Sequence, residues 1–307
     1  MTLLAALVVV IIAFMAFVSA MLFVIGPVML LQPYRRTIDY YRRLGAPLHP
    51  RDAGLPCEEV TLQTPDGIAL SCWLVKAEGR ARGTVIYLHG LSESKIAGIP
   101  MAKALHARGY NVFLYDARRH GLSGGTYCTY GYYEKYDAST AINSLVSRED
   151  LDVGRIGVFG NSMGAAVAIQ VASIDSRVRA VVAESGFASL RTVFDDYQKR
   201  MVKLPWHYLR NLVIRRSEQI AGFKASAVSP LEAVRSVHVP ILIAHGTADE
   251  RIKAAYSELV FKNANDPKEL WLIPDASHHD VAEKGGSAYM NRICAFFDTH
   301  LPTPSSP

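Results

Sequence analysis

The sequence predicts an α/β fold in which a mostly parallel, eight-stranded sheet is covered by helices. Strand-like segments alternate with helical patterns from about residue 57 onward, an order typical of parallel sheets. The Pro-Asp-Gly sequence at residues 65–67 separates the first two strand-like segments and predicts an antiparallel hairpin. The chain has 307 residues, is 50% hydrophobic and shows no break in composition between residues 55 and 300, so we expect one large domain.

The first element is an apolar run. Residues 3–31 contain no charged side chain and exceed the ~20 residues that cross a bilayer, which predicts a transmembrane helix. The alternative is a cleaved signal peptide, because Val18-Ser19-Ala20 could serve as a cleavage site. No Lys or Arg precedes the run, however, and the run continues beyond Ala20, so a retained helix is favoured.

Residues 32–54 follow as an expected juxtamembrane linker. No Lys or Arg precedes the apolar run and four arginines follow it by Arg43, so we expect the rest of the chain on the cytoplasmic side.

The four cysteines show no CxxC pairing and no metal-like spacing, and we interpret them as reduced. Tyr34, Tyr40 and Tyr41 are placed to lie near lipid headgroups or to pack against the domain.

The domain is expected at residues 55–302. Its predicted strands lie at residues 57–64, 68–75, 84–90, 111–117, 155–160, 178–185, 241–246 and 269–274. Its predicted helices lie at residues 96–107, 133–147, 163–173, 254–263 and 288–301. Residues 188–230 interrupt this alternation with a long helical stretch rich in aromatic residues and arginine, which we expect to form a lid.

A serine between two glycines lies where the fifth predicted strand meets a helix, in the sequence Gly160-Asn161-Ser162-Met163-Gly164. In a strand–Gly-x-Ser-x-Gly–helix turn, the glycines allow strand and helix to approach, and the serine hydroxyl is exposed at the end of the sheet. The pattern alone is weak. Its position between a strand and a helix makes Ser162 the candidate nucleophile.

A serine nucleophile needs a base, and the base needs an orienting acid. In this type of turn the acid and then the histidine follow on loops after later strands. Asp249 follows the seventh predicted strand and is the candidate acid, with Glu250 as the substitute. His278 follows the eighth strand and is preferred as the base, although spacing does not separate it from His279.

These motifs resemble the alpha/beta-hydrolase superfamily. Within it, the chain resembles membrane-anchored serine hydrolases grouped with lysophospholipases, monoacylglycerol lipases and protein palmitoyl-thioesterases. The matching sequences are LHG at 88–90, DARRHGLSGG at 116–125, GNSMG at 160–164, SPLEAV at 229–234, HGTAD at 245–249 and the His-x-Asp step at 278–280.

The resemblance implies an oxyanion hole formed by the backbone N–H groups of Leu91 and Met163. Two positions depart from the family. Arg119 stands where the family often has glycine, and the loop after His89-Gly90 reads LSES instead of a run of small residues.

We therefore expect a membrane-anchored serine hydrolase that cleaves carboxylic ester or thioester bonds through Ser162, Asp249 and His278. Its expected substrates are lysophospholipids, monoacylglycerols or acylated proteins, and its expected partners are a bilayer, through residues 3–31, and a small-molecule or lipid acyl substrate. This chemistry requires no metal or organic cofactor. The net charge of +5 is mild and forms no basic face with interleaved aromatic residues, so nucleic acid is not expected as a partner.

Two other functions stay open. A serine peptidase of the same superfamily would need acidic side chains in the lid to hold a substrate amino group, and the lid offers Asp195, Asp196 and Glu218. A non-catalytic anchor or binding protein could have kept the fold without the reaction.

Several further polar residues are interpreted as structural. His89, His120 and His245 each precede glycine at a strand end or turn, where a hydrogen-bonded structural role is expected. Asp116 and Arg118 are interpreted as an ion pair that braces a loop.

Overall fold

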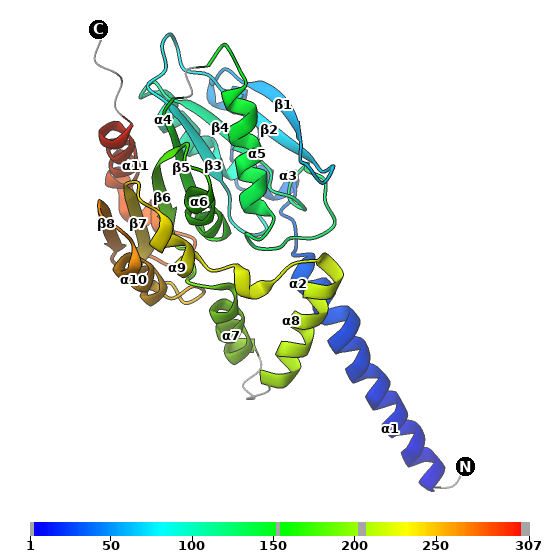
Figure 1. The fold of residues 1–307 in the computed structure, drawn as a ribbon. Coiled ribbons are helices and arrows are strands. Elements are labelled where there is room, and N and C mark those ends of the chain that lie inside the picture. Colours follow the sequence, from blue (N-terminus) through cyan, green and yellow to red (C-terminus); the bar gives the residue numbers. More distant parts are fainter. Residues whose placement is uncertain (1–2, 152–153, 202–206, 302–307) are drawn as a thin grey trace.

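A computed structural model describes residues 3–151, 154–201 and 207–301 of the chain (Figure 1). It contains one eight-stranded sheet with the order β1-β2-β4-β3-β5-β6-β7-β8. β2 pairs antiparallel with both β1 and β4, and the remaining pairs are parallel. The strands are β1 Glu58–Gln63, β2 Ala69–Val75, β3 Thr84–Leu88, β4 Asn111–Tyr115, β5 Ile156–Asn161, β6 Val178–Glu184, β7 Ile241–Gly246 and β8 Lys268–Ile273.

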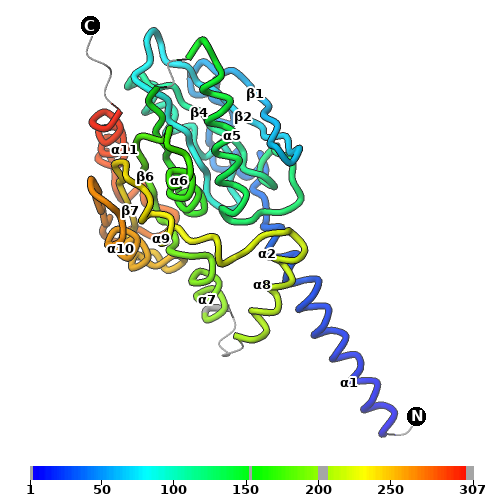
Figure 2. Tube along the Cα trace, viewed as in Figure 1, coloured from blue at the N-terminus to red at the C-terminus, as the bar shows by residue number. Residues whose placement is uncertain are grey.

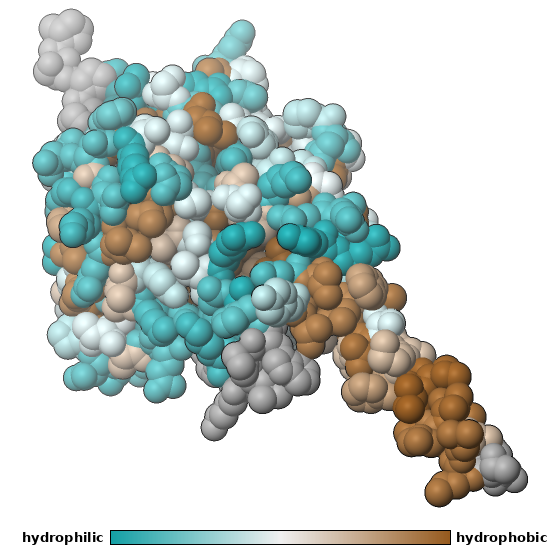
Figure 3. All heavy atoms as spheres, turned by 60° about the horizontal axis from the view of Figure 1, so that its bottom comes forward, coloured by the Kyte–Doolittle hydropathy of each residue, from teal (hydrophilic) through white to brown (hydrophobic). Residues whose placement is uncertain are grey.

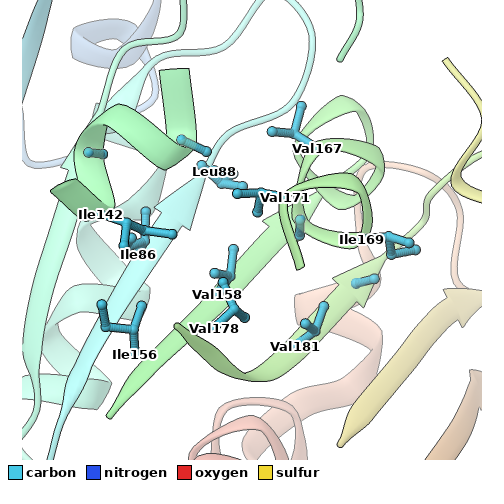
Figure 4. Close-up of a cluster of buried hydrophobic side chains, with 14 of the residues drawn as sticks. Ile86, Leu88, Ile142, Ile156, Val158, Val167, Ile169, Val171, Val178 and Val181 are labelled. Atoms are coloured by element: carbon cyan, nitrogen blue, oxygen red, sulfur yellow. The ribbon is translucent and has the colours of Figure 1, made fainter. Parts of the chain in front are cut away.

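Helices cover both faces of the sheet (Figure 1). One face packs against α5 Glu134–Val146, α6 Met163–Ile174, α9 Pro230–Ala233 and α10 Ala254–Asn263. The other packs against α3 Ile38–Arg43, α4 Ile99–His106 and α11 Val281–His300. Alternate residues of a buried strand supply the two cores, so Ile86 points to one face and Tyr87 to the other. Figure 4 shows the first core, in which Ile86, Val158 and Val171 lie together.

The predicted fold class is therefore confirmed, and each of the eight predicted strands overlaps a strand of the sheet. The predicted hairpin is β1–β2. The described residues of the 188–230 segment include the helices α7 Leu190–Met201 and α8 His207–Ala221, which lie at the end of the domain from which the N-terminal helix projects (Figure 2).

The N-terminal apolar helix runs from Leu3 to Leu31 and is long and apolar enough to cross a membrane. It consists of α1 Leu3–Ala20, a π-helical turn η1 Met21–Ile25 and α2 Gly26–Leu31. At ~1.5 Å per residue it exceeds the ~30 Å thickness of the hydrocarbon core. In Figure 3 the projecting part is covered by hydrophobic residues, whereas the visible face of the domain is mostly hydrophilic.

The C-terminal end of this helix packs against the domain. η1 and α2 lie against α8, where Gly26 approaches the side chain of Val213. Leu31 is buried, and its carbonyl oxygen accepts a hydrogen bond of 2.8 Å from the backbone N–H of Cys128. The hydroxyl of Tyr130 donates to the carbonyl oxygen of Leu30 over 2.6 Å. The helix is thus joined to the domain at its last turn, while α1 projects away from it.

Residues 32–54, expected as a linker, also contact the domain. Tyr41, on α3, is only 4% exposed and packs with the core that α4 and α11 cover. The 3-10 turn η2 Pro50–Ala53 leads into β1, and Leu55 just after it is buried. This segment is therefore packed along much of its length.

The interpretation of Asp116 and Arg118 as a mutual ion pair is wrong. The buried Asp116 carboxylate pairs instead with Lys95 Nζ at 2.6 Å. Arg118 pairs with Asp137 at 2.6 Å and Asp66 at 3.0 Å. Asp116 directly follows β4, whereas Arg118 lies in the turn after it, so each side chain finds its partner on a different element.

Candidate active site

The turn between β5 and α6 holds Ser162 in a strained conformation. Its φ of 53° and ψ of −113° lie outside the usual regions for a residue with a side chain. A Cβ on Gly160 would overlap the carbonyl oxygen of Gly164, and a Cβ on Gly164 would overlap that of Leu88. The backbone N–H of Ser162 donates to the carbonyl oxygen of Glu184 at 2.7 Å. The two glycines are therefore required by close backbone contacts on both sides of the serine.

Ser162, His278 and Asp249 form a hydrogen-bonded chain across three loops. His278 Nε2 lies 3.0 Å from Ser162 Oγ, and His278 Nδ1 lies 2.6 Å from Asp249 Oδ2. A carboxylate only accepts hydrogen bonds, so Nδ1 carries the ring proton of neutral His278 and Nε2 is free to accept the serine proton. The three predicted site residues thus meet in the geometry that serine activation needs.

Asp249 is held by several donors. Its Oδ1 accepts hydrogen bonds from the backbone N–H groups of Arg251 at 2.8 Å and Ile252 at 2.9 Å. Its Oδ2 also lies 3.2 Å from His245 Nε2. Burial by itself would raise the pKa of Asp249, but hydrogen bonds from His245 and His278 hold this pKa well below its ordinary value. The carboxylate is therefore ionised and fixed in orientation beside His278.

The alternatives to these residues lie outside the chain of hydrogen bonds. Glu250 is exposed next to Asp249. The His279 ring packs edge-on against that of His278, with 5.4 Å between centroids, and lines the cavity at Ser162. Burial and the nearby charge of Arg251 lower the pKa of His279. The structure therefore brings His278, and not His279, to both Ser162 and Asp249.

A loop of residues 89–94, between β3 and α4, forms the opposite side of the site. His89 Nε2 accepts a hydrogen bond from the Ala117 N–H at 2.9 Å, so this ring has the structural role expected for it. The Gly90 N–H donates to Glu93 Oε2 at 3.1 Å, and Ser92 has a positive φ of 68°. Leu91 lies at the crest of this loop and lines the same cavity as Ser162.

Two backbone donors are available at the site. Met163 is the first residue of α6, where a helical N–H has no partner within its own helix. Within residues 3–151, 154–201 and 207–301, no hydrogen bond is recorded from the N–H of Leu91 or of Met163. Leu91 and Met163 therefore stay the predicted donors to a substrate oxygen.

Arg119, which stands where the resembling family often has glycine, does not disrupt the local turn. Arg119 has a φ of 67°, the left-handed conformation that glycine adopts without strain. Its backbone N–H still donates to the carbonyl oxygen of Gly124 at 2.7 Å. Arginine thus occupies a glycine-like conformation at a cost of about 1–2 kcal/mol.

Two cavities meet at His278. One, of about 260 Å³, contains Ser162 together with Leu91 and Arg251. The other, of about 550 Å³, extends behind His278 between α4 and α11 and reaches Glu184. The two share Arg36, Glu93, Asn161, His278 and His279 along their linings. Space is thus present on both sides of the serine–histidine contact.

Glu184 is an unexpected buried acid at the end of β6. Burial raises the pKa of Glu184 to about 7, and the hydroxyl of Tyr289 donates to its Oε2. The carboxyl group lies in the larger cavity, while the backbone carbonyl of the same residue contacts the Ser162 N–H. Glu184 thus reaches the larger cavity through its side chain and contacts Ser162 through its backbone.

Sequence reasoning missed three residues of the site, Arg36, Glu93 and Glu184, and the contact of His245 with Asp249. No motif or spacing assigns these three residues to the site. Arg36 lies in the segment predicted to be a linker, and Glu184 is the last residue of β6, whose sequence pattern predicts a buried strand and no functional role.

Within the described part of the chain, no group of three or more His, Cys, Asp or Glu side chains is placed to hold a metal ion.

Comparisons with known proteins agree with this fold. Residues 79–228 match the protein family described as serine aminopeptidase, S33. The chain is 31% identical to the uncharacterized protein YfhR of Escherichia coli over 78% of its own length and 80% of that protein. It is 26% identical to the alpha/beta hydrolase domain-containing protein WAV2 of Arabidopsis thaliana, over 83% of each chain. Among solved structures, the esterase Pf2001 of Pyrococcus furiosus is similar, with a TM-score of 0.71 and 28% identity over 88% of this chain and 99% of that one.

Proposed function

The chain belongs to the alpha/beta-hydrolase superfamily, and from this premise we propose that it is a membrane-anchored serine hydrolase that cleaves carboxylic ester or thioester bonds. The observation that carries the proposal is the hydrogen-bonded chain Ser162–His278–Asp249 beside a cavity that Ser162 and Leu91 line. The likeness to an esterase of known structure supports ester chemistry over other hydrolytic reactions.

The proposed reaction proceeds through an acyl-enzyme. Ser162 Oγ attacks the acyl carbonyl carbon while His278 Nε2 takes the serine proton, and the ionised Asp249 stabilises the imidazolium. The N–H groups of Leu91 and Met163 donate to the resulting oxyanion, each contributing about 3–4 kcal/mol to the transition state. His278 then gives the proton to the leaving alcohol or thiol. Water attacks the acyl-enzyme by the same steps and releases the acid and free Ser162.

The apolar N-terminal helix favours amphiphilic substrates. A bilayer-bound enzyme meets lysophospholipids, monoacylglycerols or acylated proteins at high local concentration, and these carry the bonds that the site would cleave. We propose that the helix crosses the membrane and that the domain lies on the cytoplasmic side, because four arginines follow the helix by Arg43.

An aminopeptidase is the second candidate, favoured by the description of the matching family. Such an enzyme needs acidic groups that can bind a substrate amine, and the acidic side chains of the lid are already engaged. Asp195 pairs with Arg210, Asp196 pairs with Lys253 at 2.8 Å, and Glu218 accepts a hydrogen bond from the Ala225 N–H at 2.8 Å. Ester or thioester hydrolysis is therefore the better-supported reaction.

The test is a matched panel assayed with full-length protein in detergent micelles: p-nitrophenyl esters, acyl thioesters, lysophospholipids and an aminoacyl anilide. We expect turnover of esters or thioesters and none of the anilide. Turnover of the anilide alone would establish the peptidase instead. A folded protein inactive on the whole panel and unreactive toward a fluorophosphonate would support the non-catalytic alternative.

A further inference from the structure

The segment that leaves the N-terminal helix contacts three successive residues of the loop that carries Leu91. The Arg36 N–H donates to the carbonyl oxygen of Ser92 at 2.9 Å. The Arg36 guanidinium lies 2.8 Å from Glu93 Oε1. The Ser94 N–H donates to the hydroxyl oxygen of Tyr41 at 3.0 Å. These contacts join residues 36–41 to residues 92–94 at both backbone and side-chain level.

Glu93 links this segment to the backbone beside the oxyanion donor. Glu93 Oε1 accepts a hydrogen bond from the Arg36 guanidinium, and Glu93 Oε2 accepts one from the Gly90 N–H. The Glu93 N–H in turn donates to the Gly90 carbonyl oxygen at 3.2 Å. The Gly90 peptide precedes Leu91 directly. Ser92 follows Leu91 and has a positive φ. This strained conformation persists only where surrounding contacts hold the loop in place. The orientation of the Leu91 N–H therefore depends on Glu93 and Ser92, and both are bound by Arg36.

The end of the N-terminal helix also packs near the second predicted donor, Met163. Leu31 is 1% exposed and belongs to the cluster of buried side chains that contains Met163 and Cys128. Arg36 itself lines the cavity that contains Ser162. Residues 31–41 thus contact the surroundings of both backbone donors.

We propose that residues 31–41 are part of the catalytic centre, and that Arg36 is a positioning residue that orients the Leu91 N–H through Glu93 and Ser92. This inference rests on the proposed serine hydrolase function. It adds that turnover depends on how the chain leaves the membrane helix, so the anchor contributes to the chemical step as well as to location.

The contacts predict a specific kinetic signature. An oxyanion donor acts on the transition state and contributes little to ground-state binding, so its misalignment lowers kcat and leaves KM nearly unchanged. Because losing one donor costs about 10²–10³-fold, we expect Arg36→Gln to lower kcat by roughly 10- to 100-fold. Arg36→Lys keeps a cation opposite Glu93 and the backbone donor, and is expected to restore most of the rate.

The experiment uses full-length protein in detergent, with a short neutral p-nitrophenyl ester as substrate and active sites counted by fluorophosphonate titration. Arg42→Gln is the matched control, because Arg42 lies just beyond residues 31–41 on α3 and pairs with Asp39 on an exposed surface. We expect Arg42→Gln to change kcat by less than about twofold. Thermal unfolding of each variant separates misalignment from loss of folded protein.

The proposal requires that kcat per titrated site falls for Arg36→Gln while KM and the unfolding midpoint stay close to those of the wild type. A wild-type kcat per site in this variant would overturn it, as would a loss matched by Arg42→Gln. If Arg36→Gln does not fold, Tyr41→Phe takes its place. This variant keeps the buried ring and removes the acceptor of the Ser94 N–H, and it should lower kcat several-fold.

The outcomes also separate this inference from the proposed function. A wild-type protein that neither reacts with the fluorophosphonate nor hydrolyses any ester would overturn the proposed function, and the role of Arg36 with it. An active wild type with an unaffected Arg36→Gln would overturn the role of Arg36 alone.

Discussion

The Ser162 turn and the loop at residues 89–94 face the same cavity, but they are held in place by different means. The turn is fixed by its own neighbours, because two glycines allow close backbone contacts around a strained serine. The loop is held by residues from the distant N-terminal segment, chiefly through the Arg36–Glu93 ion pair and the Tyr41 hydroxyl.

This difference separates what can be predicted from a short motif from what depends on tertiary contacts. A strained turn needs specific residues at fixed offsets, so its sequence is recognisable. A loop held by contacts with a distant segment needs only complementary partner residues elsewhere in the chain, at no fixed spacing. Ser162 and the loop at residues 89–94 therefore differ in how mutations far from the site should affect them.

The largest expected effect is at the base. His278→Ala should lower ester turnover by roughly 10⁴-fold or more, because the members of a triad act as a unit. His279→Ala should stay within about tenfold of the wild type, or ~1.4 kcal/mol in the barrier. Steady-state rates of both variants on one p-nitrophenyl ester decide between them. The reverse ranking would assign the base to His279.

A smaller effect, on stability, is expected at the glycine after the serine. Gly164→Ala places a Cβ against the Leu88 carbonyl oxygen, and we expect a loss of about 2–4 kcal/mol in the free energy of unfolding. Gly124→Ala is the control, since its added Cβ meets nothing closer than 3.5 Å. Thermal unfolding in detergent compares the two. Equal midpoints would show that the turn tolerates a side chain and is not fixed by its own backbone contacts.

The smallest expected effect concerns pH. The folded-state pKa of Glu184 is about 7, above its ordinary value of 4.5, so its contribution to stability is full below 4.5 and is lost as the pH rises through 7. The difference between the two pKa values corresponds to a contribution on the order of 3 kcal/mol. Glu184→Gln cannot ionise and should show a smaller fall in unfolding midpoint between pH 5 and pH 8 than the wild type. Parallel curves for the two proteins would contradict the assigned pKa.

Much of the fold could be predicted from the sequence, because buried strands and amphipathic helices leave periodic patterns. Ser162, Asp249 and His278 could be proposed because each follows a predicted strand in the chain order of a known catalytic arrangement. The structure brings these three together. Their catalytic roles stay predictions until they are tested.

The contacts between residues 36–41 and residues 92–94 could not be predicted from the sequence. Arg36 and Glu93 are 57 residues apart, and neither lies in a motif that requires the other. The pairing of Asp116 with Lys95 and of Arg118 with Asp137 was missed for the same reason, since each partner lies on a different element. Arginines that follow an apolar helix are also ordinarily explained by membrane topology, which leaves no signal for a role in the site.

The central claim is that Ser162 is the nucleophile, and covalent labelling tests it most directly. Full-length protein is treated with a fluorophosphonate, digested and mapped by mass spectrometry, alongside Ser162→Ala and the control Ser185→Ala, which alters a buried serine that also has a positive φ. We predict one adduct, on Ser162, that is absent from Ser162→Ala and retained in Ser185→Ala. An adduct on another residue, or wild-type ester turnover by folded Ser162→Ala, would contradict the account.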